Sequence, residues 1–379
     1  MNVVFLYSRV MPYTLHCLRL LVKSFGAHVH LVHYPVSAEA PYQLPPVAGI
    51  TYYDQTQFSV DELIQQVGCL KPRFLFVSGW VSPGYLKVAR WARTQSIAVI
   101  GGCDTPWRGD IRQRAAVLFS KYLIRRNFDY FMVAGRYQYE YARRLGFRRE
   151  RILMPLYLAH TAPFEEAYAA CRATKRQRYP KNILFVGRLE TVKGIALLLE
   201  AFGSIADKRG WQLTVVGNGT LKEALRVAYA HHEAIVFKDF MQPARLVHEI
   251  AQAGAFCLPS TYEPWGVVIQ EFAAAGLPLI TSRACGAASV FVREGYNGYT
   301  HAPGDVSALT HSLKRLMALS EEALLTFSER SSSLAQALTP EMFVSNFYQF
   351  LGEGTSAADV EGQKKEPSPQ TRHHVSGTC

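Results

Sequence analysis

The chain has 379 residues, of which 49% are hydrophobic and 19% are charged, and its net charge is +11. This length and balance are typical of two globular domains or one large one, and they exclude a fibrous or wholly disordered protein. The seven cysteines are scattered and never spaced as Cys-x-x-Cys, which argues against a disulfide framework or a zinc site and favours a reducing cytosol.

Short apolar runs alternate with amphipathic stretches along the whole chain. No run reaches the roughly 18 residues of a membrane span, and we expect the first residues to form a strand rather than a signal peptide. In the first half, strands are predicted at 3–7, 29–33, 74–78, 97–101 and 130–134, with helical sequence at 15–25, 60–68 and 85–94. In the second half, strands are predicted at 183–186, 212–216, 234–237, 255–258 and 278–281. This alternation predicts an α/β protein with two Rossmann-like domains, each built on a parallel sheet.

The domain boundaries follow from composition. Residues 1–160 form the first predicted domain, and residues 181–338 form the second. The polar segment 161–180 between them shows no strand pattern and is predicted to be a linker. Residues 352–379 are rich in Gly, Ser, Pro, Lys and Glu, so we predict a disordered tail. Ligands of open α/β sheets bind at the carboxyl ends of the strands, so the residues that follow each strand are the candidate site residues.

The excess positive charge lies entirely in the first domain. Residues 1–160 hold 20 Lys and Arg against 9 Asp and Glu, whereas the remainder holds 21 of each. Within residues 107–128, Ile111, Ala115, Leu118 and Tyr122 share one predicted helical face. This pattern suits a helix on an anionic membrane, and its alternative is a core-packed helix with a solvated basic edge. No nucleic-acid-binding pattern accompanies it. The cations around this face, which we expect to meet a membrane or an acidic acceptor, are Arg112, Arg114, Lys121, Arg125 and Arg126.

Cations and glycines follow the first two strands of the second domain. Arg188 and Lys193 come between the strand at 183–186 and a helix expected to begin near Gly194, an arrangement that can cradle an anion at the helix N-terminus. The alternative is a solvated turn in which these cations pair with Glu190. The glycines at 217 and 219 allow close approach to a flat ligand, although they are also typical of an ordinary strand-to-helix turn.

The stretch "PSTYEPWGVVIQEFAAAGLPLI" follows the strand at 255–258. Glu263 lies in the predicted loop, and Glu271 lies about one turn inside a helix expected to begin near Val267. The free backbone N–H groups near Gly266 lie between these carboxylates. Acceptor, anion hole and acceptor in this order suit a nucleotide sugar. Two glutamates on a helix more often face solvent, but this helix is otherwise apolar.

With these residues placed, the second half resembles the retaining glycosyltransferases of family 4, which have the GT-B fold of two Rossmann-like domains facing each other across a cleft. The motifs are "FVGRLETVKG", "VVGNG", the Glu-x7-Glu stretch and "REGYNGYTHAPGD", and they span about 182–305. The resemblance implies that Arg188 and Lys193 bind the donor diphosphate, that Glu271 binds the ribose, and that Glu263 and the following amides bind the sugar and phosphate. It also implies that residues 238–241 contact the base, and that a helix at 339–351 crosses back to the first domain. The full implied set of donor-binding residues is Gly187, Gly217, Asn218, Asp239, Phe240, Trp265, Gly266, Val267, Val268 and Glu271.

The first domain departs from the family pattern in three places. The loop after its first strand reads "YSRVMPYT" and lacks the usual glycines, so Arg9 occupies that space. Cys103 stands where many members have histidine, while the neighbouring Asp104 is kept, and a histidine-based acceptor site is not supported. "PLYLAH" replaces the usual Asn-Gly-Val-Asp. Asp104 is the candidate to orient the acceptor or accept its proton, and its alternative role is a capping acid before "TPW".

Together with the resemblance, these features predict a hexosyltransferase that moves a sugar from a nucleoside diphosphate donor to a saccharide or lipid-linked acceptor in bacterial surface polysaccharide or glycolipid assembly. The resemblance implies that the configuration is retained. Because the sequence has no Asp-x-Asp pair, we expect neither metal nor other cofactor. The expected catalytic set is Arg188, Lys193, Glu263 and Asp104, in a cytoplasmic protein that binds the inner face of the cytoplasmic membrane peripherally. The alternatives are a sugar-nucleotide-binding partner or inactive paralogue, and a sugar-nucleotide epimerase.

Overall fold

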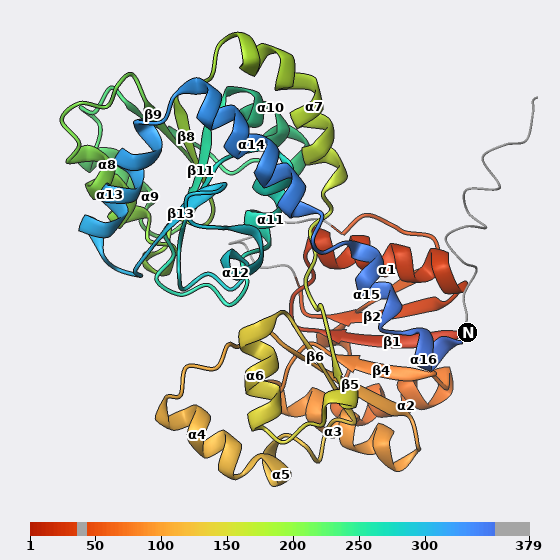
Figure 1. The fold of residues 1–379 in the computed structure, drawn as a ribbon. Helices are drawn as coiled ribbons and strands as arrows, with labels where there is room; N and C mark the ends of the chain where they lie inside the picture. The colour runs from red at the N-terminus through yellow and green to blue at the C-terminus, as the bar shows by residue number, and fades with distance from the viewer. Residues whose placement is uncertain (36–43, 353–379) are drawn as a thin grey trace, which may run out of the picture.

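The computed structural model describes residues 1–35 and 44–352. The first domain is built on a parallel sheet with strand order β3-β2-β1-β4-β5-β6-β7 (Figure 1). Its strands are β1 (Asn2–Tyr7), β2 (His28–His33), β3 (Ile50–Asp54), β4 (Phe74–Val77), β5 (Ala98–Cys103), β6 (Tyr130–Val133) and β7 (Ile152–Leu153). Its helices are α1 (Pro12–Phe25), α2 (Val60–Leu70), α3 (Pro83–Thr94), α4 (Ile111–Leu118), α5 (Ser120–Leu123) and α6 (Arg136–Arg144), with 3-10 turns at Gln55–Gln57 and Arg149–Arg151.

The second domain is built on a separate parallel sheet with strand order β10-β9-β8-β11-β12-β13. Its strands are β8 (Asn182–Val186), β9 (Gln212–Val216), β10 (Ile235–Lys238), β11 (Ala255–Leu258), β12 (Leu279–Ser282) and β13 (Gly298–His301). Its helices are α7 (Ala162–Gln177), α8 (Ile195–Gly203), α9 (Lys222–Ala228), α10 (Pro243–Gln252), α11 (Val267–Ala274), α12 (Ala288–Phe291), α13 (Val306–Met317) and α14 (Glu321–Ala335), with a 3-10 turn at Thr191–Lys193. The predicted class, two Rossmann-like α/β domains, is confirmed.

Every predicted strand is present within two residues of its expected bounds. Central strands of a parallel sheet are buried on both faces, so their sequences read as continuous apolar runs that are easy to recognise. Three strands were not predicted. β3 is a half-exposed edge strand rich in tyrosine, β7 has two residues, and β13 begins with a glycine.

The predicted linker is a helix. α7 packs on α10 and α11, so residues 162–177 are part of the second domain rather than an extended connection. Phe164 of α7 places its ring 5.9 Å from that of Phe272 in α11. The prediction of a linker rested on the absence of a strand pattern. The helix was missed because its few buried apolar side chains are separated by many polar residues.

After α14 the chain returns to the first domain as two short helices, α15 (Pro340–Ser345) and α16 (Tyr348–Leu351), where one was expected (Figure 1). α15 packs against α1. Between the two helices, Phe347 stacks its ring on that of Phe74 at 5.0 Å, and Arg73 Nε donates a hydrogen bond to Phe350 O at 3.3 Å. The predicted disordered tail, 352–379, lies outside the described residues from 353 onward.

The chain therefore crosses between the domains twice, and one side chain holds both crossings. Gln270 is fully buried on α11. Its Oε1 accepts a hydrogen bond from the N–H of Ala159, in the first crossing, at 2.9 Å. Its Nε2 donates to Ala335 O at 3.1 Å and to Leu338 O at 2.7 Å, at the start of the second crossing. α11 also borders the space between the domains, so one helix both holds the two crossings and lines that space.

Candidate active site

A cavity of about 580 Å³ lies between the two domains, at the carboxyl ends of their central strands. From the first domain it is lined by Arg9, Met11, Pro12, Tyr13, Asp104 and Tyr157. From the second domain it is lined by Val186, Gly187, Arg188, Lys193, Val216, Gly217, Asn218, Phe240, Met241, Gln242, Leu246, Leu258, Glu263, Pro264, Trp265, Gly266, Val267, Val268 and Glu271. The four predicted catalytic residues and nearly all the predicted donor-binding residues thus share one cavity.

A partly buried ion pair joins the loops that follow β8 and β11. Lys193 ends the 3-10 turn before α8, and its ammonium contacts Glu263, which lies 70 residues further along the chain. Both side chains are mostly shielded, with 18% and 12% exposure. Lys193 does not pair with Glu190, because the Glu190 carboxylate is engaged by the N–H and hydroxyl of Thr220. The alternative of a solvated turn in which both cations pair with Glu190 is therefore wrong for Lys193. For Arg188 it is not excluded, because the pKa of Glu190 is lowered by the hydrogen bonds from Thr220 and also by the charge of Arg188.

The N-terminus of α11 faces the cavity. Its N-cap, Gly266, has φ of +88°, which is a left-handed conformation that side chains other than glycine rarely adopt. A Cβ at this position would also lie 2.9 Å from Glu263 Cγ. The first N–H groups of any α-helix have no partner within the helix and carry the positive end of its dipole. Since Val267 and Val268 line the cavity, this end of α11 can receive an anion.

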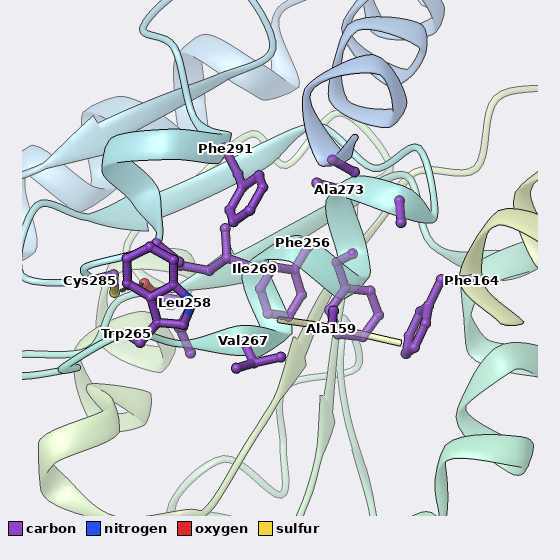
Figure 2. Close-up of a cluster of buried hydrophobic side chains, with 14 of the residues drawn as sticks. Ala159, Phe164, Phe256, Leu258, Trp265, Val267, Ile269, Ala273, Cys285 and Phe291 are labelled. Atoms are coloured by element: carbon purple, nitrogen blue, oxygen red, sulfur yellow. Dashed lines mark hydrogen bonds between the residues drawn. The ribbon is translucent and has the colours of Figure 1, made fainter. Parts of the chain in front are cut away.

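The helix is held in place by the core beneath it. Figure 2 draws Ile269 and Ala273 of α11 in one cluster of buried hydrophobic side chains with Phe256 and Phe291. Phe272 stacks on Phe256 with ring centroids 4.2 Å apart. This packing makes the N-terminus of α11 a rigid wall of the cavity.

Glu271 lies on the same helix, next to this wall. Burial raises the pKa of Glu271 to about 7. A carboxyl group with that pKa exchanges its proton near neutral pH, and it gains from any ligand hydroxyl that donates a hydrogen bond to its charged form. The location suits a group that binds hydroxyls of a ligand in the cavity.

Asp104 follows β5 and faces the cavity from the first domain. Burial raises the pKa of Asp104, and the hydroxyl of Tyr157 donates a hydrogen bond to its Oδ2 at 3.5 Å, which acts in the opposite sense. The ring of Tyr13 lies 5.6 Å from that of Tyr157. Neither tyrosine was predicted, because they come from a helix N-terminus and from the first crossing and carry no recognisable motif.

A second carboxamide joins the two walls of the cavity. Gln138 of α6 is buried, and its Nε2 donates to Asp104 O at 2.9 Å and to Pro264 O at 2.7 Å. Nearby, the ring of Trp265 is 2% exposed and packs on Gly135, where a Cβ would lie 2.3 Å from the ring. Trp265 therefore lines the cavity while also forming part of the contact between the domains.

Several predicted residues lie elsewhere. The Asp239 carboxylate is 75% exposed and pairs with Lys222 at 2.6 Å, outside the cavity lining, whereas its neighbour Phe240 lines the cavity. Cys103, which stands at the family's histidine position, is buried, and its thiol donates to Thr105 O. Among the described residues, the five predicted membrane or acceptor cations, Arg112, Arg114, Lys121, Arg125 and Arg126, do not line the cavity. They lie on α4, α5 and the turn after them.

Two facing Rossmann-like domains with a cavity at the carboxyl ends of both sheets define a GT-B glycosyltransferase fold. The structure aligns with the sucrose-phosphate synthase of Thermosynechococcus elongatus with a TM-score of 0.69 at 18% identity, covering 92% of this chain and 97% of the other. It aligns with Anabaena HepE, solved in complex with UDP and glucose, with a TM-score of 0.67 at 16% identity, covering 93% and 99%. These likenesses confirm the fold.

Residues 172–331, which include most of the second domain, match the family model of the glycosyl transferases group 1. This match confirms the expected resemblance to group 1 glycosyltransferases, whereas family 4 in particular stays a prediction. The chain is also 30% identical over 205 residues to the glycogen synthase of Mycobacterium tuberculosis (strain H37Rv), covering 53% of this chain and 47% of that protein. The chain spans about half the length, or less, of the curated relatives that it matches.

Proposed function

We propose that the protein is a retaining, metal-independent glycosyltransferase of family 4. It moves a hexose from a nucleoside diphosphate sugar to a saccharide or lipid-linked acceptor. The observation that carries the proposal is that Arg188, Lys193, Glu263, Glu271 and the N-terminus of α11 meet in one cavity. Cations, free N–H groups and two carboxylates are the groups that a diphosphate, a ribose and a hexose require.

The donor side supplies charge stabilisation. When the bond between the anomeric carbon and the β-phosphate oxygen breaks, negative charge grows on the diphosphate. Arg188, Lys193 and the N-terminus of α11 stabilise this charge, and one well-placed donor of this kind contributes about 2.7–4 kcal/mol. A donor phosphate competes with Glu263 for Lys193, which leaves the Glu263 carboxylate available to the sugar hydroxyls.

The acceptor side is the wall formed by Asp104, Tyr157 and Tyr13. The acceptor oxygen attacks the anomeric carbon on the face from which the diphosphate leaves, so the configuration is retained. The acceptor proton passes to the departing phosphate oxygen, while Asp104 orients the acceptor hydroxyl. In its alternative role, Asp104 takes this proton in place of the phosphate oxygen, and its raised pKa suits that role.

HepE, one of the structural neighbours, was solved with UDP and glucose, which supports a nucleotide-sugar donor. We assign the activity to bacterial surface polysaccharide or glycolipid assembly on the inner face of the cytoplasmic membrane. Among the described helices, none combines the length and apolar character needed to cross a bilayer. The membrane contact that we propose is therefore peripheral.

The test is a transfer assay with radiolabelled UDP- and GDP-hexoses and lipid or saccharide acceptors, run with and without EDTA. We expect product in both, with the donor's anomeric configuration by NMR. Lys193→Gln should abolish transfer, whereas Lys314→Gln, at an exposed lysine on α13, should leave it unchanged. Loss of transfer in EDTA that Mg²⁺ restores would refute metal independence, and an inverted product would refute retention.

Two other outcomes favour the alternatives. Nucleotide binding without turnover on any acceptor favours a binding partner or inactive paralogue, a reading consistent with the buried Cys103 at the family's histidine position. Release of free, epimerised donor favours an epimerase.

A further inference from the structure

In the segment 107–128, the polar Gln113, Ser120 and Asn127 are buried together with Ile124 and Phe128, whereas five large apolar side chains point outward. The segment was expected to form one helix, but it forms α4 and α5, which meet at Phe119. The outward apolar side chains are Ile111, Leu118, Phe119, Tyr122 and Leu123, which are 85%, 76%, 51%, 64% and 52% exposed. In Figure 1, α4 and α5 lie at the lower end of the first domain and project from it. We call this surface the α4–α5 face.

Polar groups hold the inner side of the two helices. The buried Gln113 accepts hydrogen bonds from the N–H groups of Arg108 and Gly109 and donates to Pro106 O at 2.7 Å. The buried Asn127 donates to Leu123 O at 2.7 Å and accepts from Arg90 at 3.0 Å. Because the surface helix of a globular protein normally has the opposite arrangement, the outward apolar stripe requires another explanation.

Cations surround the stripe. Residues 108–126 contain six Lys and Arg against the single carboxylate of Asp110, which caps α4. Arg112, Lys121 and Arg126 are exposed, and the Lys121 ammonium lies 5.8 Å from the ring centroid of Tyr122. The exposure of Ile111, Leu118 and Tyr122 excludes the alternative in which this face of the segment packs on the core. An apolar stripe bordered by cations is the arrangement of a helix that lies in the interface of an anionic bilayer.

We propose that the α4–α5 face docks on a membrane surface that contains anionic phospholipid, with its apolar side chains among the acyl chains and its cations among the headgroups. A second copy of the chain is a poorer occupant. In a two-fold dimer the same patch meets itself, and these cations would then face one another.

The face is connected to the cavity. Asp104 and Ile111 are seven residues apart, so they are at most about 25 Å from each other along the chain. In the intervening loop, the Arg108 guanidinium lies 4.5 Å from the ring centroid of Tyr262, which precedes Glu263. A docked protein thus holds the acceptor wall near the bilayer. This placement of the acceptor rests on the proposed function, whereas the docking itself does not.

The test is sedimentation of the full chain with vesicles of phosphatidylcholine alone or mixed equally with phosphatidylglycerol, without sugar nucleotide, at about 50 mM and 500 mM NaCl. We expect binding to the anionic vesicles at low salt only. The triple variant Arg112→Gln/Lys121→Gln/Arg126→Gln should lower the partition coefficient about 100-fold, since each cation near an anionic surface contributes several-fold. The matched control is Lys23→Gln/Arg226→Gln/Lys314→Gln, at exposed cations elsewhere, and it should bind to a similar extent as wild type.

A second pair of variants tests the apolar stripe. Leu118→Ser/Tyr122→Ser should also weaken binding, whereas Val227→Ser, at a 76% exposed valine on α9, should not. Absence of wild-type binding at low salt, or equal loss in the test and control variants, would overturn the proposal. A concentration-dependent dimer that Leu118→Ser/Tyr122→Ser dissociates would assign the face to a second copy instead. Because no donor is present, failure here is distinct from failure of the transfer assay.

Discussion

Replacing Glu271 by glutamine should make the protein more stable than wild type at pH 8. The difference in stability between the two proteins should be smaller at pH 5. The pKa of Glu271 is about 7 in the folded protein and 4.5 as the reference value for an exposed glutamate. One pKa unit corresponds to about 1.4 kcal/mol, so ionised Glu271 costs the folded state about 3 kcal/mol. Glutamine has nearly the same shape and no charge at any of these pH values.

The sign follows from proton binding. Below pH 4.5 the group is protonated in both states and costs nothing. Between pH 4.5 and 7 the unfolded chain has released the proton while the folded chain retains it, so stability falls as pH rises. Above pH 7 the penalty is constant. From pH 5 to pH 8, wild type should lose about 2–3 kcal/mol relative to Glu271→Gln.

The assay is urea unfolding followed by tryptophan fluorescence, with both proteins measured at half-unit steps from pH 5 to pH 8. Subtracting the two curves cancels the other titrating groups, which the proteins share. Glu233→Gln, at an exposed glutamate, is the matched control and should give a flat difference. A flat difference for Glu271→Gln as well would refute the view that Glu271 is desolvated in the cavity.

Three further predictions concern Asp104 in the proposed acceptor wall, Gln270 at the two interdomain crossings, and Gly266 at the N-terminus of α11. Asp104→Asn should lower kcat by about 100-fold or more while nucleotide-induced thermal stabilisation is kept, and an unchanged kcat would remove Asp104 from the mechanism. Gln270→Met should cost about 3 kcal/mol in urea unfolding, because one N–H and two carbonyls lose their partner; a loss below about 1 kcal/mol would mean that water replaces the carboxamide. Gly266→Ala should weaken nucleotide binding in calorimetry by displacing Glu263, whereas Gly304→Ala, which is also left-handed but faces open space, should not; equal affinities would show that the contact is irrelevant.

Much of the architecture was accessible from the sequence, for a physical reason. Buried parallel strands must be apolar on both faces, so β1, β4 and β11 stand out as short apolar runs. The same rule fails for β3 at a sheet edge, where four of five residues are partly exposed. α7 was missed for a different reason: the few apolar residues by which this helix packs are dispersed among polar residues.

The side of the cavity to which we assign the donor was predictable because its groups lie at fixed positions after strands. Arg188 follows β8, Gly217 follows β9, and Glu263 follows β11, and the carboxyl ends of neighbouring parallel strands meet at one edge of the sheet. The acceptor side was less accessible. Tyr13 and Tyr157 come from unrelated segments, and only the packing of α1 against the first crossing brings them to Asp104.

By itself, then, the sequence determined which candidate site residues follow which strands, the two-domain class and the motif proposed to bind the donor. These features depend on periodicity and local spacing. Tertiary structure alone decided three matters that depend on contacts between distant segments. It pairs Lys193 with Glu263 rather than Glu190, it closes both interdomain crossings on Gln270, and it turns the apolar side of α4 and α5 outward. The helical pattern of residues 111–122 is the same for a core helix and for the membrane-facing helix that we propose, and it is the exposure of Ile111, Leu118 and Tyr122 in the folded protein that excludes the core helix.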